Sequence, residues 1–143
     1  MPLKRRAILL ALHPRFARLI YSGEKTAELR RVAPSSEVRI AYIYETAPVG
    51  RVTGWFQIEG SDRDSATKLW SRYQKSLSIT RAEYLKYVRG CRQPTVLSIS
   101  SRRKFRRGLA LANLHGPVRP PQSYRYFDPR LPIHRRPSRQ SKE

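Results

Sequence analysis

The sequence predicts a single α+β domain followed by a basic tail. Short segments in which apolar and polar residues alternate are typical of half-buried strands, and three other segments repeat apolar residues with the period of a helix. The chain has 143 residues, which is enough for one domain with a core and too few for two ordinary domains. We expect the domain to span residues 1–127. Residues 128–143 are polar, basic and interrupted by proline, so we expect them to be disordered.

The chain begins with a predicted strand, a helix and a second strand. The apolar run Ala7–Leu12 suits a buried strand. Pro14 is favourable as the first residue of a helix, because its missing N–H needs no partner there. Gly23 should end this helix, since glycine adopts the left-handed cap conformation at little cost. A strand is expected over residues 26–31, where the side chains alternate between two faces.

Charged residues share one face of this second strand. Alternation places Glu28 and Arg30 on one side and Ala27 and Leu29 on the other. If Glu28 and Arg30 pair, the carboxylate stays ionised and can accept hydrogen bonds from a base edge, while Lys25 at the preceding turn could meet a phosphate. The residue types therefore suit ligand recognition, and the spacing fits a purely structural ion pair equally well.

Three further strands are expected in the rest of the domain. Residues 38–44 and 51–58 both alternate and flank a proline-containing turn, so they predict neighbouring antiparallel strands. Residues 95–100 predict a later strand. After residue 100 we expect irregular, partly packed chain up to residue 127.

Two more helices are expected between these strands. The first begins at Asp64 or Ser65, either of which can cap a helix, and Trp70 should lie in its buried face. The second begins at Thr80, which forms a capping-box pattern with the glutamate three residues later, and ends at Gly90.

Charge limits the classes of partner. Lys and Arg total 30 against 10 acidic residues, a formal charge of +20. Such a charge favours a polyanion, because neutralised phosphates release counterions and arginine matches phosphate oxygens. Nucleic acid is the first expectation, an anionic membrane surface is the second, and a tail that merely adds charge is the third. The residues expected to contact a nucleic-acid backbone are Arg102, Arg103, Lys104, Arg106, Arg107, Arg135 and Arg136.

Metal sites, cofactor sites and membrane-spanning segments are not predicted. Cys91 is the only cysteine, which excludes an internal disulfide and fits a reducing, cytoplasmic location. His13, His115 and His134 lie far apart, and none has a second ligand at metal-binding spacing. No phosphate-binding glycine loop or nucleophile elbow is present. No segment approaches the roughly 20 apolar residues that span a bilayer.

Four segments together resemble the ASCH family, the activating-signal-cointegrator homology domains of the PUA-like superfamily. The first has a helix followed by the pattern G-x-K-x-x-E-x-R, and the second has paired strands around a proline turn. A helical insert and a closing PPQS segment complete the similarity, which runs from about residue 7 to residue 127. The matching residues are Gly23, Lys25, Glu28, Arg30, Tyr44, Pro48, Gly54 and the run 120–123.

The resemblance implies a small, mixed β-barrel of the PUA-like kind with about three short helices around it and a cleft beside the motif. It also implies RNA or nucleotide binding, so RNA is favoured over DNA. Trp55 points away from the apolar face of its strand and could stack on a base. With it, the expected ligand-binding residues are Gly23, Lys25, Glu28, Arg30, Tyr44, Trp55, Gln122 and Ser123.

Two other functions stay open. Some small bacterial ASCH proteins are amidohydrolases that act on acetylated cytidine and use a lysine of this motif, a threonine and a distant glutamate. Lys25 matches that lysine, whereas Glu28 stands at the position of the threonine. A hydrolase acting on a modified nucleoside or on RNA would use Lys25 and Glu28 as catalytic residues. The remaining alternative is a regulatory module that binds protein partners, which the sequence does not identify.

Overall fold

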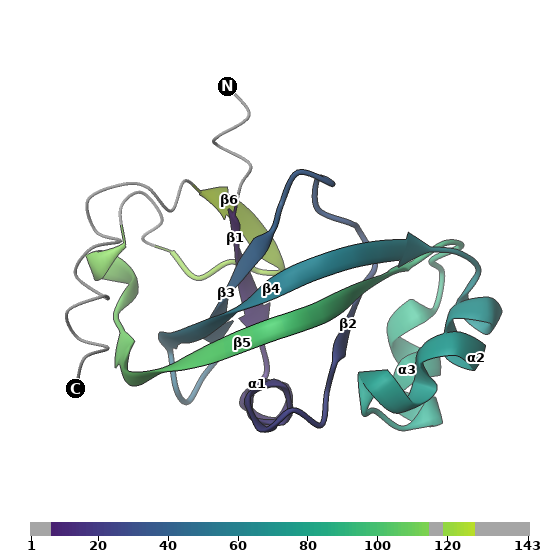
Figure 1. The fold of residues 1–143 in the computed structure, drawn as a ribbon, viewed down its shortest axis with the longest axis horizontal. Coiled ribbons are helices and arrows are strands. Elements are labelled where there is room, and N and C mark those ends of the chain that lie inside the picture. The colour runs from purple at the N-terminus through teal and green to yellow at the C-terminus, as the bar shows by residue number, and fades with distance from the viewer. Residues whose placement is uncertain (1–6, 115–118, 128–143) are drawn as a thin grey trace.

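A curled, six-stranded mixed sheet organises the protein, and three α-helices lie at its lower edge and side (Figure 1). The computed structural model describes residues 7–114 and 119–127. The elements within those ranges are β1 (Ala7–Leu12), α1 (Pro14–Ser22), β2 (Ala27–Arg30), β3 (Ile40–Glu45), β4 (Arg51–Arg63), α2 (Ala66–Leu77), α3 (Arg81–Val88), β5 (Thr95–Leu109), the 3-10 turn η2 (Leu111–Asn113) and β6 (Tyr124–Phe127).

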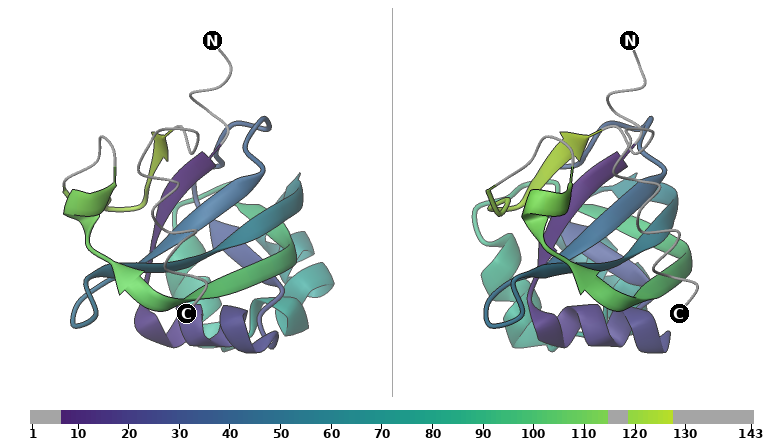
Figure 2. Two further views of the ribbon diagram at one scale, coloured as in Figure 1. Left: turned by 60° about the vertical axis from the view of Figure 1, so that its left-hand side comes forward. Right: turned by 90° about the vertical axis from the view of Figure 1, so that its left-hand side faces the viewer.

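The sheet has the strand order β2-β5-β4-β3-β1-β6. β1 pairs with β3 in parallel, and the other described pairs are antiparallel. β4 and β5 are 13 and 15 residues long, and their register shifts at several points. Bulges of this kind increase strand twist and bending, and Figure 2 shows the resulting half barrel. The predicted α+β class with three short helices is confirmed.

Three apolar clusters hold the fold together. One lies between α1 and the sheet and includes Ile8, Ile43 and Phe56. A second lies under η2 and includes Tyr42 and Tyr44. The third fixes α2 and α3 against β2 and β5, and it contains the following buried residues: Ala27, Leu29, Leu69, Leu77, Tyr84, Val88 and Val96. Because β2 buries Ala27 and Leu29 in this third cluster, Glu28 and Arg30 project from the other face of the strand.

The helix boundaries agree with the local signals in the sequence. Gly23 takes φ 90° after α1, as the left-handed cap requires. Ser65 rather than Asp64 caps α2, since its side chain accepts a hydrogen bond from the Lys68 N–H. Thr80 opens α3 with the capping box expected from its sequence. Short-range hydrogen bonds thus determine where these helices begin and end.

The irregular chain expected directly after residue 100 is instead the second half of β5. The basic run continues the strand and pairs with β4, with Trp55 opposite Arg103 and Gly54 opposite Lys104. Only Phe105 and Leu109 of this half are buried, so exposed basic side chains obscured its alternation. The strand expected over 38–44 begins two residues later, at Ile40. β4 runs on to residue 63 instead of ending at 58.

Candidate functional site

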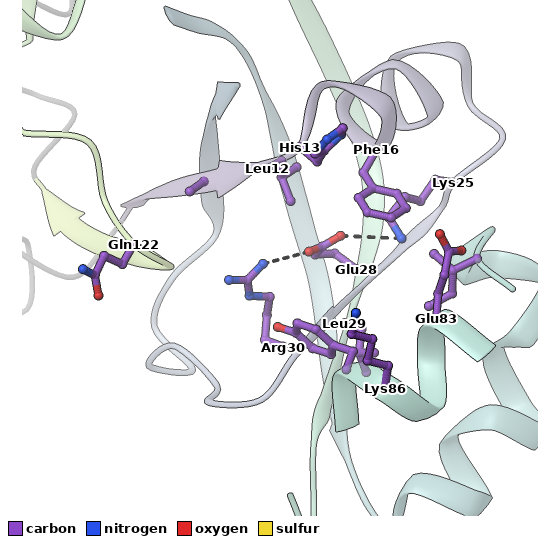
Figure 3. Close-up of a pocket in the computed structure, with 13 residues that line it drawn as sticks. Leu12, His13, Phe16, Lys25, Glu28, Leu29, Arg30, Glu83, Lys86 and Gln122 are labelled. Atoms are coloured by element: carbon purple, nitrogen blue, oxygen red, sulfur yellow. Dashed lines mark hydrogen bonds and ion pairs between the residues drawn. The ribbon is translucent and has the colours of Figure 1, made fainter. Parts of the chain in front are cut away.

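A pocket of about 610 Å³ opens beside β2. Its walls come from the end of β1, the start of α1, β2 with its preceding turn, α3 with its preceding turn, and the segment before β6 (Figure 3). The volume falls within the range usual for small-ligand sites. The lining residues are Ala11, Leu12, His13, Phe16, Lys25, Glu28, Leu29, Arg30, Ile79, Glu83, Lys86, Tyr87 and Gln122.

A row of three charged side chains from the β2 segment forms one wall of this pocket. Glu28 lies between two cations: its Oε2 accepts a hydrogen bond from Arg30 Nη1 at 2.9 Å, and its Oε1 lies 3.6 Å from Lys25 Nζ (Figure 3). All three residues are at most 7% exposed. The second contact is an ion pair rather than a hydrogen bond, because 3.6 Å is too long for one. The row carries two positive charges and one negative charge.

Burial changes the chemistry of Lys25. Its ammonium donates a hydrogen bond to the Leu77 carbonyl at 2.6 Å and lies 5.3 Å from the centre of the Phe16 ring. Loss of hydration lowers the pKa of Lys25, the Glu28 carboxylate acts to raise it, and the charges of Arg30 and Arg15 lower it again. The net shift is downward, so Lys25 is more readily deprotonated than an exposed lysine.

Arg30 connects β2 to the segment that precedes β6. Its Nη2 donates a hydrogen bond to Ser123 Oγ at 2.5 Å. Its Nε is buried and has no hydrogen-bond partner in the described part of the chain. An unpaired buried donor is costly. Tyr87 stands nearby on α3, and burial raises the pKa of its hydroxyl.

At the rim of the pocket, α1 contacts α3. Arg15 forms two hydrogen bonds with the Glu83 carboxylate, at 2.6 and 3.3 Å. These bonds and the Thr80 backbone N–H lower the pKa of Glu83 to about 2. His13 caps α1, since its Nδ1 accepts from the Arg15 N–H at 3.3 Å, and its ring packs edge-on to Phe16.

The structure brings together some of the residues expected to bind a ligand and separates others. Lys25, Glu28, Arg30 and Gln122 line the pocket, and Ser123 reaches it through its hydrogen bond with Arg30. The remaining three do not line it: Gly23 caps α1, Tyr44 is buried in the cluster under η2, and Trp55 packs against that cluster.

The basic residues of β5 lie on the protein surface. Arg102, Arg103, Lys104, Arg106 and Arg107 are all exposed. Arg102 approaches Gly23, and Lys104 Nζ lies 5.9 Å from the centre of the Tyr21 ring. The tail residues Arg135 and Arg136, and the predicted disorder of residues 128–143, lie outside the described residues.

Several lining residues come from parts of the chain that the motif does not include. Phe16 lies on α1, and Glu83, Lys86 and Tyr87 lie on α3. A helical pattern predicted α3, but no signal in the sequence indicated that this helix packs beside β2.

Within residues 7–114 and 119–127, no group of three metal-ligating side chains is gathered. No helix in those ranges is long and apolar enough to cross a membrane.

Comparison with known proteins identifies a family and a fold. The model of the ASCH domain family matches residues 10–105 of this chain. A protein of Zymomonas mobilis described as an ASCH domain-containing ribonuclease is 33% identical over 104 residues, which cover 71% of this chain and 70% of that protein.

Crystal structures of the ASCH protein from Zymomonas mobilis have the same fold. One superposes with a TM-score of 0.79 and 28% identity, covering 92% of each chain. A serine-to-alanine variant of that protein gives a TM-score of 0.81 with 27% identity over 93% of this chain and 94% of that one. A tyrosine-to-phenylalanine variant gives 0.81 with 28% identity over 92% of this chain and 96% of that one.

Proposed function

Because this chain belongs to the ASCH domain family, we propose that it binds RNA and holds one nucleotide of the strand in the pocket beside β2. The relative described as a ribonuclease acts on RNA by its name, and the charge of +20 suits a polymer of phosphates. A free nucleoside would not require so much charge. The basic residues of β5 and of the tail then contact phosphates along the RNA strand.

The buried charged row carries this proposal. Lys25 and Arg30 contribute two positive charges against the single negative charge of Glu28. A buried row with a net positive charge favours an anion, because charged donors make strong hydrogen bonds to anionic oxygens. Glu28 retains acceptor positions beyond its two contacts, so it can receive hydrogen bonds from the amino or imino groups of a base.

The other walls suit the flat part of a nucleotide. Phe16 and Tyr87 supply aromatic rings, and Leu12, Leu29 and Ile79 supply apolar surface. Stacking of a base on an aromatic side chain contributes roughly 1 to 3 kcal/mol. Phosphate recognition by the charged row and base recognition by the apolar walls would therefore act together in one pocket.

Binding of RNA is tested with Arg30→Lys. Lysine keeps the positive charge and loses the forked donors that hold Glu28 and Ser123, so we expect RNA affinity about tenfold weaker. Fluorescence anisotropy with a labelled RNA of mixed sequence measures this, and a DNA of the same sequence measures the preference for RNA. Arg39→Lys, at an exposed position outside the pocket, is the matched control. Equal affinities for both variants and the parent would contradict the proposed pocket.

Cleavage of RNA is a second candidate, favoured by the lowered pKa of Lys25 and by the relative described as a ribonuclease. In this reaction the RNA 2′-oxygen forms a bond to phosphorus and the bond from phosphorus to the 5′-oxygen breaks. In its deprotonated form Lys25 would accept the 2′-hydroxyl proton, and solvent would protonate the departing 5′-oxygen. Arg30 stabilises the negative charge that develops at phosphorus.

The two candidates predict different outcomes for Lys25→Met. If the protein cleaves RNA, the parent produces fragments with a 2′,3′-cyclic phosphate and a 5′-hydroxyl, and the variant does not. If the protein only binds, intact labelled RNA is recovered from both. Mass spectrometry of the RNA after incubation distinguishes these outcomes, and anisotropy shows whether the variant still binds.

A further inference from the structure

A second hollow, of about 620 Å³, lies on the exposed side of α1. It is separate from the pocket beside β2 and shares no lining residue with it. The two are adjacent through one contact: Arg15 lines the hollow, and its guanidinium binds Glu83, which lines the pocket. The residues around the hollow are Arg15, Arg18, Leu19, Tyr21, Ser22, Glu24, Ser78 and Lys104.

The hollow carries more positive than negative charge. Arg15, Arg18 and Lys104 are set against a single acid, Glu24, whose carboxylate contacts Ser22 Oγ at 3.4 Å. Arg18 is exposed and makes no hydrogen bond or ion pair with the part of the chain that the structure describes. A guanidinium in this condition is available to a ligand, and its planar donors fit phosphate oxygens.

Cations from two distant segments meet at this hollow. Lys104 lies on β5 beside the Tyr21 ring of α1, and Arg102 of the same strand lies against Gly23 at the end of α1. The Tyr21 hydroxyl is already hydrogen-bonded to Thr53 at 2.7 Å. Tyr21 therefore presents its ring, and the polar contacts to a ligand come from the cations.

We infer that this hollow, named here the α1–β5 groove, is a second RNA site that holds the phosphates of nucleotides next to the one in the pocket. The inference rests on the proposed function. In this arrangement the RNA strand passes from the pocket over the Arg15–Glu83 contact and along α1 to Lys104. The groove then recognises the backbone and contributes no base selectivity, because cations read phosphates and not base edges.

Ligands of different length distinguish binding in the groove from binding in the pocket. A nucleoside monophosphate fills the pocket alone, so its affinity should be the same for the parent and for the double variant Arg18→Ala/Lys104→Ala. A 12-nucleotide RNA of mixed sequence reaches both, and the double variant should bind it more weakly. The logarithm of its affinity should also fall less steeply with the logarithm of salt, by about 1.4 for two lost phosphate contacts to a single strand.

The matched control is Arg63→Ala/Lys68→Ala, which also removes one arginine and one lysine and lines neither the pocket nor the groove. Anisotropy at several salt concentrations measures the 12-nucleotide RNA, NMR titration measures each of the four nucleoside 5′-monophosphates, and thermal unfolding verifies that all variants are folded. Arg18→Gln/Lys104→Gln, which keeps longer polar side chains, replaces the alanine pair if the latter unfolds.

These measurements test the proposed function and the groove separately. If the parent does not bind RNA, the proposed function fails and the groove fails with it. If the parent binds RNA and the groove variant has the same salt dependence as the control, the groove inference alone is overturned. It is also overturned if the groove variant loses affinity for the monophosphates as strongly as for the longer RNA.

Discussion

Glu28 and Arg30 lie two residues apart on β2, and their side chains form a buried ion pair with Oε2 and Nη1 2.9 Å apart. Strand geometry places residues two apart on the same face, and Lys25 approaches the same carboxylate from the preceding turn. Glu28 therefore balances two cations, and all three side chains are largely shielded from solvent.

Replacing Glu28 with glutamine should destabilise the fold strongly. The substitution keeps the shape of the side chain and leaves two buried cations without an anion, which typically costs about 3 to 5 kcal/mol. Urea unfolding followed by circular dichroism measures the free energy of unfolding. The exposed Glu37→Gln is the control and should change it by less than about 0.5 kcal/mol. If Glu28→Gln lowers the free energy of unfolding by less than about 1 kcal/mol, the ion pairs of the row do not stabilise the fold.

Lys25 should titrate below its ordinary pKa of 10.5, because burial lowers its pKa more than Glu28 raises it. In Glu28→Gln that pKa should fall further, and in Arg30→Met it should rise because a repelling charge is removed. NMR of lysine carrying ¹³C at Cε reports each titration. Between the lowered pKa and 10.5 the unfolded chain binds more protons at Lys25, so the free energy of unfolding rises with pH there.

The variant Lys25→Met lacks this contribution, whereas the exposed Lys68→Met keeps it. The difference between the two variants in the pH dependence of unfolding, from neutral pH toward 10.5, isolates the effect of Lys25. The prediction is refuted if Lys25 titrates together with the exposed lysines.

The contact between α1 and α3 should respond to acid. The pKa of Glu83 is lowered to about 2 from 4.5, so its contribution to stability is present above about pH 4.5 and is lost as the pH falls toward 2. Glu83→Gln keeps a residue suited to the capping box and removes the charge that binds Arg15. The melting temperatures of parent and variant should therefore differ at pH 6 and converge near pH 2. If the difference in melting temperature stays constant across this range, the charge of Glu83 does not stabilise the contact.

Gly54 should not tolerate a side chain. A Cβ at this position would lie 2.6 Å from the Tyr21 hydroxyl and closer still to the backbone oxygen of Arg103, which β-sheet pairing holds in place. Gly54→Ala should cost about 1 to 3 kcal/mol or more by overpacking. Gly60→Ala in the same strand meets no atom within 4 Å, so it should be neutral or slightly stabilising. Chemical denaturation compares them, and similar results for both would contradict the close approach at Gly54.

The helices and their ends could largely be predicted because their causes lie within a few residues. Gly23 ends α1 and Thr80 opens α3 through bonds to residues at most three positions away. The charged face of β2 followed from its two-residue repeat. The prediction of irregular chain for the second half of β5 was wrong. Its pairing with β4 is a contact between distant segments, and its exposed side chains are mostly basic.

The sequence by itself determined the α+β class, the end of α1 at Gly23, the start of α3 at Thr80, the excess of positive charge and the placing of Glu28 and Arg30 on one face of a strand. Only the tertiary structure decided what surrounds that pair. The Leu77 carbonyl reaches Lys25 from 52 residues away, and the Ser123 hydroxyl reaches Arg30 from 93 residues away. Caps and alternation are enforced by neighbouring backbone atoms, whereas burial, the lowered pKa of Lys25 and the pocket itself require the packing of α3 and the half barrel against β2.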